Sequence, residues 1–429
     1  MNWLNKIVQI FKVPELRNKI LFVLAIFVVF RLMTAIPIPG VDAQSLKDLF
    51  ERSAMGGFLN ILNVFSGGAL SNLSIIMLGL GPYITATIVL QLLTMIFPAL
   101  EKMYKEEGES GRQKFNQWGR MATIPLALLQ GYTMLNLLQR AGVVVFTDPL
   151  SLITSLVVMT ASCMILMWLG ELITEKGIGN GVSLLIFAGI VARIPESIWE
   201  IRYKWDISQL PAYLLFIAVS LVIVAGVVMV NEARRNIPVS YAKRVRGNKV
   251  FGGVSTYLPL NINPAGVIPI IFAISILMLP SMISNFFVEA PGLIGSIAKS
   301  TGDFFNNQVV YNGLYFLLVC AFTYFYTAVT FDPKNISSNL QKMGGYVPGI
   351  RPGESTAKFI HYILNRVLLL GALFLAIVAV LPSVIAGTMG IQVFSFFVGG
   401  TSLLIIVSVV LETMRQIKAQ LQMRDYESF

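Results

Sequence analysis

Ten long apolar stretches constrain the fold of this chain more than any other feature. They cover residues 20–36, 74–97, 119–139, 152–171, 181–195, 212–231, 264–286, 309–330, 359–381 and 395–414. A helix needs roughly 20 apolar residues to cross the hydrocarbon layer of a membrane. Backbone polar groups in lipid must be paired within their own segment, so these stretches favour helices over strands. The sequence predicts an all-α polytopic membrane protein with ten transmembrane helices, of which the fifth is short if it ends before Pro195.

The distribution of charge predicts how the helices are oriented. Only 13% of the 429 residues are charged, whereas a soluble domain carries about 25%. Of the 32 Lys and Arg residues, 23 fall on the side that carries both termini and 7 on the other, while Arg31 and Arg366 lie within apolar stretches. Because positive charge is retained in the cytoplasm, we expect a multi-pass protein of the cytoplasmic (inner) membrane with both termini cytoplasmic.

The number of apolar stretches predicts two halves. Five lie in residues 20–195, before a connection at 196–211, and five lie in residues 212–414. An odd number in each half makes the halves run oppositely through the membrane, as in inverted repeats with a pathway between them. An N-terminal interfacial segment (1–19) and a cytoplasmic tail (415–429) are expected outside the two halves.

Residues 57–71 are too polar and Gly-rich to cross a membrane. They include an amphipathic segment with Phe58, Leu62 and Phe65. Such a segment can fold into the membrane only where protein or water surrounds it. A full-length span is expected to follow from residue 74, with Pro82 interrupting its hydrogen-bond ladder.

The sequence offers little for catalysis. Phosphate-binding loops, HExxH pairs and nucleophile elbows are absent from it. His361 is the single histidine, and Cys163 and Cys320 both lie in apolar stretches, so neither a metal site nor a disulfide is expected. We therefore expect no enzyme, no catalytic residues and no cofactor.

Eight motifs resemble those of one membrane-protein family. They are PIPGVDAQSL, FSGGALSNLSI, GPYITATIVLQLLT, EEGESGRQKFNQWGR, LMWLGELITEKGIGNGVSLLIFAGIV, NPAGVIPIIFA, FYTAVTFDPKNISSNLQKMGGYVPGIRPGESTAKFI and FVGGTSLLIIVSVVLETM. In this order, and from about residue 16 to the C-terminus, the chain resembles bacterial members of the SecY/Sec61 alpha family. That family supplies the central subunit of the Sec protein translocation channel.

The resemblance implies a clamshell of two inverted five-helix halves with a pore between them. Unfolded secretory polypeptides would cross through the pore, and membrane-protein segments would leave sideways into lipid. It also implies partners: the SecE and SecG subunits, the SecA motor ATPase, the ribosome through its RNA, signal peptides and nascent polypeptides, and the lipid bilayer.

The resemblance further implies four sets of functional residues. The pore ring is Leu80, Ile84, Val182, Ile186, Ile271 and Ile405. The plug, at about 57–71, includes Phe58, Leu62, Phe65, Ser66, Gly67 and Gly68. The lateral gate contains Thr85, Thr87, Gln91 and Asn263. Docking of the motor and the ribosome involves Lys243, Arg244, Arg246, Lys249 and Arg351.

Arg351 lies in GGYVPGIRPGES, residues 344–355, a polar stretch in an otherwise apolar chain. Pro348 and Pro352 fix their own φ and bias the residues before them to extended conformations. The four glycines of this stretch permit sharp turns. We therefore expect a shaped loop that presents one guanidinium for planar, bidentate contacts, which Lys cannot reproduce.

Two other functions remain open on the residues alone. A secondary transporter for a small solute would share the inverted repeat, and would need an ion or substrate site near mid-membrane. A structural scaffold would need neither a site nor a pathway.

Overall fold

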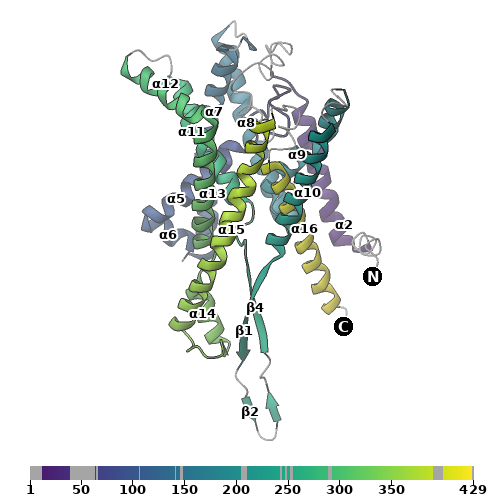
Figure 1. Cartoon of the computed structure of the whole chain (residues 1–429), viewed down its shortest axis with the longest axis vertical. Helices are drawn as coiled ribbons and strands as arrows, with labels where there is room; N and C mark the ends of the chain where they lie inside the picture. Colours follow the sequence, from purple (N-terminus) through teal and green to yellow (C-terminus); the bar gives the residue numbers. More distant parts are fainter. Residues whose placement is uncertain are drawn as a thin grey trace.

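The structure, a computed structural model of the chain, describes residues 12–38, 63, 66–105, 107–140, 142–144, 148–203, 210–241, 244–246, 249–251, 255–287, 292–389 and 400–427. The fold is mostly helical and elongated (Figure 1). Most of the long helices run roughly along the long axis of the molecule, and a β-hairpin projects beyond them at one end.

The elements follow the chain in this order. The helices are α2 (Pro14–Thr34), α5 (Gly81–Ile96), α6 (Pro98–Lys105), α7 (Gly108–Arg140), α8 (Pro149–Lys176), α9 (Gly181–Tyr203), α10 (Leu210–Glu232), α11 (Ile268–Phe287), α12 (Leu293–Asn306), α13 (Gln308–Thr330), α14 (Pro333–Lys342), α15 (Glu354–Met389) and α16 (Gly400–Glu427). The strands are β1 (Arg234–Tyr241), β2 (Arg244–Arg246), β3 (Lys249–Phe251), β4 (Ser255–Asn261) and β5 (Gly345–Tyr346).

The strands correct the all-α prediction. β1 pairs antiparallel with β4, placing Ile237 opposite Leu258, and its other edge pairs with β5, placing Ser240 opposite Tyr346. In β1, Ile237 and Val239 are buried while Asn236 and Pro238 are exposed. This alternation has the period of a strand. Within 232–262, the described residues therefore form paired strands, β1 with β4 and β2 with β3.

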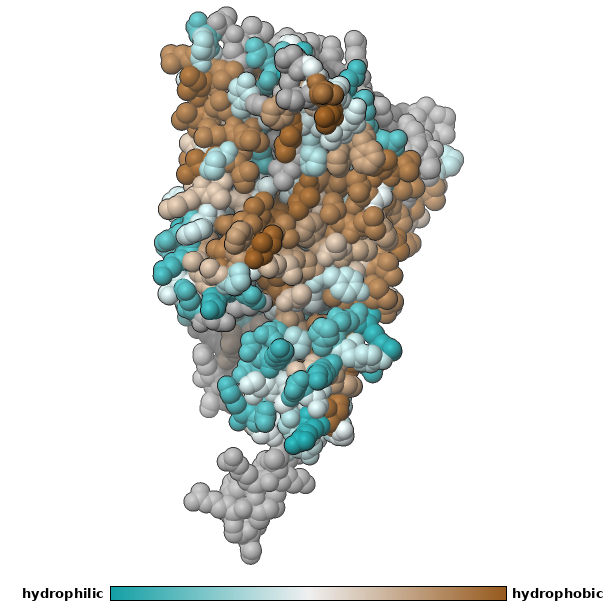
Figure 2. Space-filling model, turned by 90° about the vertical axis from the view of Figure 1, so that its left-hand side faces the viewer, coloured by the Kyte–Doolittle hydropathy of each residue, from teal (hydrophilic) through white to brown (hydrophobic). Residues whose placement is uncertain are grey.

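Several helices are suited to crossing a membrane. Five of the described helices, α7, α8, α10, α13 and α15, contain segments long and apolar enough to do so. A sixth candidate is the pair α5 and α6, which is bent by 115° at the break between them. In the view of Figure 2, apolar residues cover the middle of the molecule, and polar residues gather toward the hairpin end.

The second span differs from the prediction. Residues 66–80 form turns, and the helix begins only at Gly81, so α5 has 16 residues. Pro82 lies in the first turn of α5 and does not interrupt a helix. Proline is tolerated there, because the first N–H groups of a helix have no intrahelical partner. The apolar composition of residues 74–80 concealed the turns.

Other helices extend beyond their predicted ends. α9 continues through Pro195 to Tyr203, although its apolar part is Gly181–Pro195. α16 continues to Glu427, through most of the expected tail. The predicted boundaries followed hydropathy alone, whereas helices often continue into the polar region beyond the lipid. Residues 1–11 of the predicted interfacial segment lie outside the described part of the chain.

Buried apolar residues form one large cluster and three smaller ones. The large cluster takes residues from α2, α5, α8, α9, α10, α11, α13, α15 and α16, and so lies among the long helices. A separate small cluster lies under the hairpin, with Ile237, Leu260, Val347 and Ile360 at its centre. The pore-ring residues belong to the first of these cores, and the Arg351 loop belongs to the second.

Candidate functional site: an apolar ring and a hairpin platform

All six predicted ring residues lie in the large apolar cluster or pack against it. Leu80, Ile84, Ile186, Ile271 and Ile405 are all buried members of it, and the partly buried Val182 packs against it. They come from four elements: α5 and the residue before it, α9, α11 and α16. α11 packs against α5, and α9 packs against α16. The structure thus brings together aliphatic side chains from distant parts of the sequence.

The plug prediction is only partly covered by the described residues. Phe58, Leu62 and Phe65 lie outside them, whereas Ser66, Gly67 and Gly68 are described and buried. Gly67 has a φ of +69°, and a Cβ on it would lie 2.8 Å from Gly189 Cα of α9. Only glycine allows so close an approach of two backbones in this conformation.

Hydrogen bonds hold the turns that follow the plug residues. The Asn63 carbonyl accepts from the Gly68 N–H at 2.8 Å, and its side-chain Oδ1 accepts from the Ser71 N–H at 2.9 Å. Ser74 Oγ donates to the Met33 carbonyl at 2.8 Å, which ties the turns to the end of α2. The described part of the predicted plug segment therefore lies against α2 and α9.

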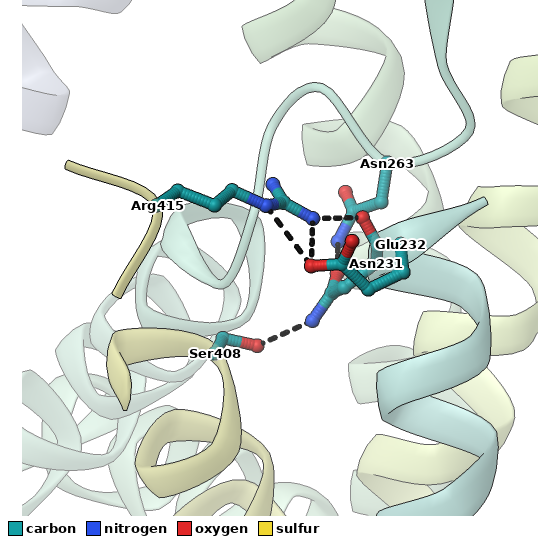
Figure 3. A network of polar contacts seen from close by, with 5 residues as sticks. All are labelled: Asn231, Glu232, Asn263, Ser408 and Arg415. Carbon is teal, nitrogen blue, oxygen red and sulfur yellow. Dashed lines mark hydrogen bonds and ion pairs between the residues drawn. The ribbon is translucent and has the colours of Figure 1, made fainter. Parts of the chain in front are cut away.

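The four predicted gate residues do not form one hydrogen-bond network. The Thr85 hydroxyl donates to the Gly81 carbonyl at 2.9 Å, and the Thr87 hydroxyl donates to carbonyls of its own helix. Gln91 Oε1 is buried and accepts no hydrogen bond from the described residues. Asn263 donates instead to Asn231 Oδ1, at the end of α10, at 2.9 Å (Figure 3).

The two predicted docking loops are joined. Arg244 and Arg246 lie in β2 and Lys249 in β3, while Lys243 lies outside the described residues. Their hairpin continues into β1, which pairs with β5 at the start of the Arg351 loop. We call β1, β4 and residues 331–363 the platform. No local sequence pattern indicated that its two parts are in contact.

The Arg351 loop has the shape that its composition predicts. Gly344, Gly349 and Gly353 have φ values of +72°, +80° and +98°. The Ser337 hydroxyl donates to the Gly353 carbonyl at 2.6 Å, and the Thr356 hydroxyl donates to the Arg351 carbonyl at 2.9 Å. Val347 is buried in the small cluster while Arg351 is exposed. The backbone around the guanidinium is therefore fixed at both ends.

Sequence reasoning missed two polar links between helices. Arg120 of α7 pairs with Glu171 of α8 at 2.9 Å. Arg415 of α16 pairs with Glu232 of α10 at 3.0 Å. These residues lie at or near the ends of apolar stretches, which is a weak signal, because charges there also set topology. Within the described ranges, no group of three or more His, Cys, Asp or Glu is placed to hold a metal ion.

Comparisons with known proteins indicate one family. The model of the SecY family matches residues 74–414. The protein translocase subunit SecY of Streptomyces scabiei is 43% identical over 433 residues, which cover 98% of each chain. The subunit of the same name from Thermotoga maritima is 42% identical over 427 residues, covering 98% of this chain and 96% of that one.

Solved structures share the fold. A protein-conducting channel superposes with a TM-score of 0.62 at 17% identity, covering 93% of this chain and 91% of the other. Sec61 in a canine ribosome–channel complex superposes with a TM-score of 0.59 over the same shares. A family match over most of the chain, near-full-length relatives above 40% identity and a common fold lead to one conclusion: this chain belongs to the SecY family.

Proposed function

We propose that this chain is the pore subunit of a protein-conducting channel, which passes unfolded secretory polypeptides across a membrane and releases membrane-protein segments sideways into lipid. The observation that carries the proposal is that six aliphatic side chains from four elements lie in one buried apolar cluster or pack against it. A cargo of arbitrary sequence needs a constriction without fixed charges, since fixed charges would retain some segments.

In this proposal ten helices cross the membrane in two inverted halves. Six of the spans are the candidates named above, with α5 and α6 counted as one. The other four are α2, α9, α11 and α16. α9 and α11 contain shorter apolar helices, Gly181–Pro195 and Ile268–Leu277. Spans one to five and six to ten would form the halves 20–195 and 212–414, joined near residues 196–211.

The plug and the contact face between α5 and α11 have roles in opening the channel. The plug, about 57–71, closes the ring in the resting state and leaves it when a polypeptide enters. The lateral gate opens between α5 and α11, which pack against each other. Since the Thr85 and Thr87 hydroxyls bond within α5, packing rather than hydrogen bonds from these two residues would close it.

The platform is the docking surface of the channel. It would face the cytoplasm, on the same side as both termini, and bind the SecA motor ATPase and the ribosome. Support comes from the projecting hairpin, its basic residues and the solved ribosome complex of canine Sec61. Basic side chains would contact ribosomal RNA phosphates in a salt-dependent manner. SecE and SecG would complete the channel in the cytoplasmic membrane.

Crosslinking of a trapped polypeptide tests the pore directly. Cysteine is placed singly at Ile84, Ile271 and Ile405 after Cys163 and Cys320 are replaced, and a secretory chain is stalled during translocation. We expect crosslinks from all three positions and none from a matched control at Leu317, which is 63% exposed on the outer surface of α13. Equal crosslinking at Leu317, or uptake of a small solute without protein translocation, would contradict the proposal.

A further inference from the structure

Five polar residues join the base of the hairpin to α16. They are Asn231 and Glu232 at the end of α10, Asn263 between β4 and α11, and Ser408 and Arg415 of α16 (Figure 3). Asn263 is one of the predicted gate residues, and the other four residues belong to none of the four predicted sets. These residues are far apart in the sequence, and they meet where the long helices end and the hairpin begins.

Asn231 is the centre of this network. Its side-chain Nδ2 donates to Ser408 Oγ at 2.8 Å, and its Oδ1 accepts from Asn263 Nδ2 at 2.9 Å. Asn263 Nδ2 also donates to the Gly266 carbonyl at 3.0 Å. Asn231, Asn263 and Ser408 are all buried. Removing one partner from a buried hydrogen bond leaves the other unsatisfied, so the three side chains depend on one another.

Arg415 binds the same end of α10 through the backbone carbonyl of Asn231 and the side chain of Glu232. Its Nη2 donates to the Asn231 carbonyl, and its Nε and Nη2 donate to Glu232 Oε1 at 3.1 and 3.0 Å. The last carbonyls of a helix have no intrahelical partner, and a cation near them is favoured by the helix dipole. Arg415 therefore caps α10 where its chain turns into β1.

The network connects both strands of the hairpin to ring-bearing helices. β1 begins at Arg234, two residues after Glu232, and the Ile262 N–H donates to the Ala233 carbonyl at 3.0 Å, which closes the base of the hairpin. Asn263 then leads into α11, which carries Ile271. Ser408 lies one helical turn from Ile405 on α16. A displacement of the hairpin base would reach Ile405 along α16, and Ile271 through the turns at 264–267 and α11.

We propose that Asn231 and Arg415 are positioning residues that couple the platform to the pore ring. They fix the hairpin base to α11 and α16, so that a partner pushing on the platform also moves Ile271 and Ile405. The proposal rests on the proposed function, since it assumes that a motor docks on the platform. A network that only stabilised the fold would affect folding or docking, whereas a coupling network affects the step after docking.

The test separates docking from transport. The full chain with its partner subunits is reconstituted in proteoliposomes, and ATP-driven translocation is measured against motor concentration for wild type, Arg415→Gln, Arg415→Lys and Asn231→Ala. We expect Arg415→Gln and Asn231→Ala to lower the maximum rate about fivefold or more, at the lower end of couplings between sites. The motor concentration that gives half the maximum rate should stay unchanged, and Arg415→Lys should recover part of the loss.

Arg120→Gln is the matched control, because it removes a comparable interhelical ion pair between α7 and α8, neither of which contributes a residue to the network. It should keep the wild-type maximum rate. An unchanged maximum rate in Arg415→Gln, or a loss equal to that of Arg120→Gln, would overturn the coupling. If Asn231→Ala does not fold, the two Arg415 variants still decide the question. A wild-type complex that moves no polypeptide would overturn the proposed function itself.

Discussion

The ring and the platform are built from the same few aliphatic residue types, yet different interactions hold them. The predicted ring residues belong to the large apolar cluster among the long helices, and neighbouring hydroxyl groups such as that of Thr85 bond within their own helix. The apolar cluster of the platform has four buried members among the described residues, and the platform adds strand pairing and three positive-φ glycines. The ring depends on the shape of its side chains, whereas the platform depends on its backbone.

This difference implies different tolerance to change. Aliphatic exchanges that conserve volume are tolerated well in a packed core, so a ring of Leu, Ile and Val can vary in composition and still close. The platform has few residues to compensate for a lost contact. Small changes should therefore disrupt the structure of the platform while the helical bundle stays intact.

The largest effect is expected at Arg351, on the platform. Arg351→Glu should abolish motor-driven translocation, and Arg351→Lys should impair it, because an ammonium cannot make the planar, bidentate contacts of a guanidinium. Translocation into proteoliposomes measures the effect. Expression and membrane topology should be unchanged in both variants.

Lys334→Glu is a suitable control for charge alone, since Lys334 is also exposed and lies on α14 of the same platform. It should translocate much better than Arg351→Glu. Equal defects in these two variants, or normal activity of both Arg351 variants, would mean that Arg351 serves only to set topology.

The next effect concerns the ring. Replacing all six ring residues by Gly should open an ion leak, and a single Ile84→Gly or Ile405→Gly should loosen the seal to a smaller extent. Single-channel conductance in planar bilayers measures both. Gly at six equally buried positions elsewhere in the large cluster controls for loss of packing. Unchanged conductance in the six-fold variant would remove these residues from the seal.

The helical bundle and the platform also differ in how far the sequence predicts them. Apolar runs located most of the long helices: 152–171 lies within α8, and 212–231 lies within α10. They could not distinguish turns from helix when both were apolar. Leu70, Leu73 and Ile76 are buried like residues of a span although they lie in turns. Pro82 was the residue that indicated where the helix begins, because proline favours the first turn of a helix.

The platform could not be predicted from the sequence for a different reason. Its strands are short and polar on one face, and the local signs of them were the alternation of Ile237 and Val239 in β1 and that of Leu258 and Leu260 in β4. The pairing of β1 with β5, and the link from Asn231 to Asn263, join segments separated in the chain. Such contacts depend on the tertiary arrangement, which local patterns do not encode.

A third prediction compares one truncation in the two cores. Ile360→Ala removes a fully buried side chain from the small cluster, and such a change costs about 2–5 kcal/mol. In so small a core we expect the loss to release the Arg351 loop from β1. Hydrogen exchange of residues 344–353 should speed up, while exchange in α8 stays slow. Ile173→Ala, equally buried in the large cluster, should instead lower global thermal stability and leave the loop protected.

The smallest effect should come from the backbone of the platform. Gly349 has a φ of +80°, and a Cβ added there would have no neighbouring atom within 4 Å. Gly349→Ala would therefore meet no clash and would cost only the left-handed conformation, about 1–2 kcal/mol. Gly313, within α13, also has open space but ordinary helical geometry, so Gly313→Ala should be neutral or slightly stabilising.

The two substitutions add the same methyl group, and thermal unfolding in detergent with local hydrogen exchange should separate them. Faster exchange around residue 349 in the first variant alone would show that turn geometry holds the platform. Equal behaviour of the two variants would mean that the loop adapts, and that the contrast with the ring is one of size only.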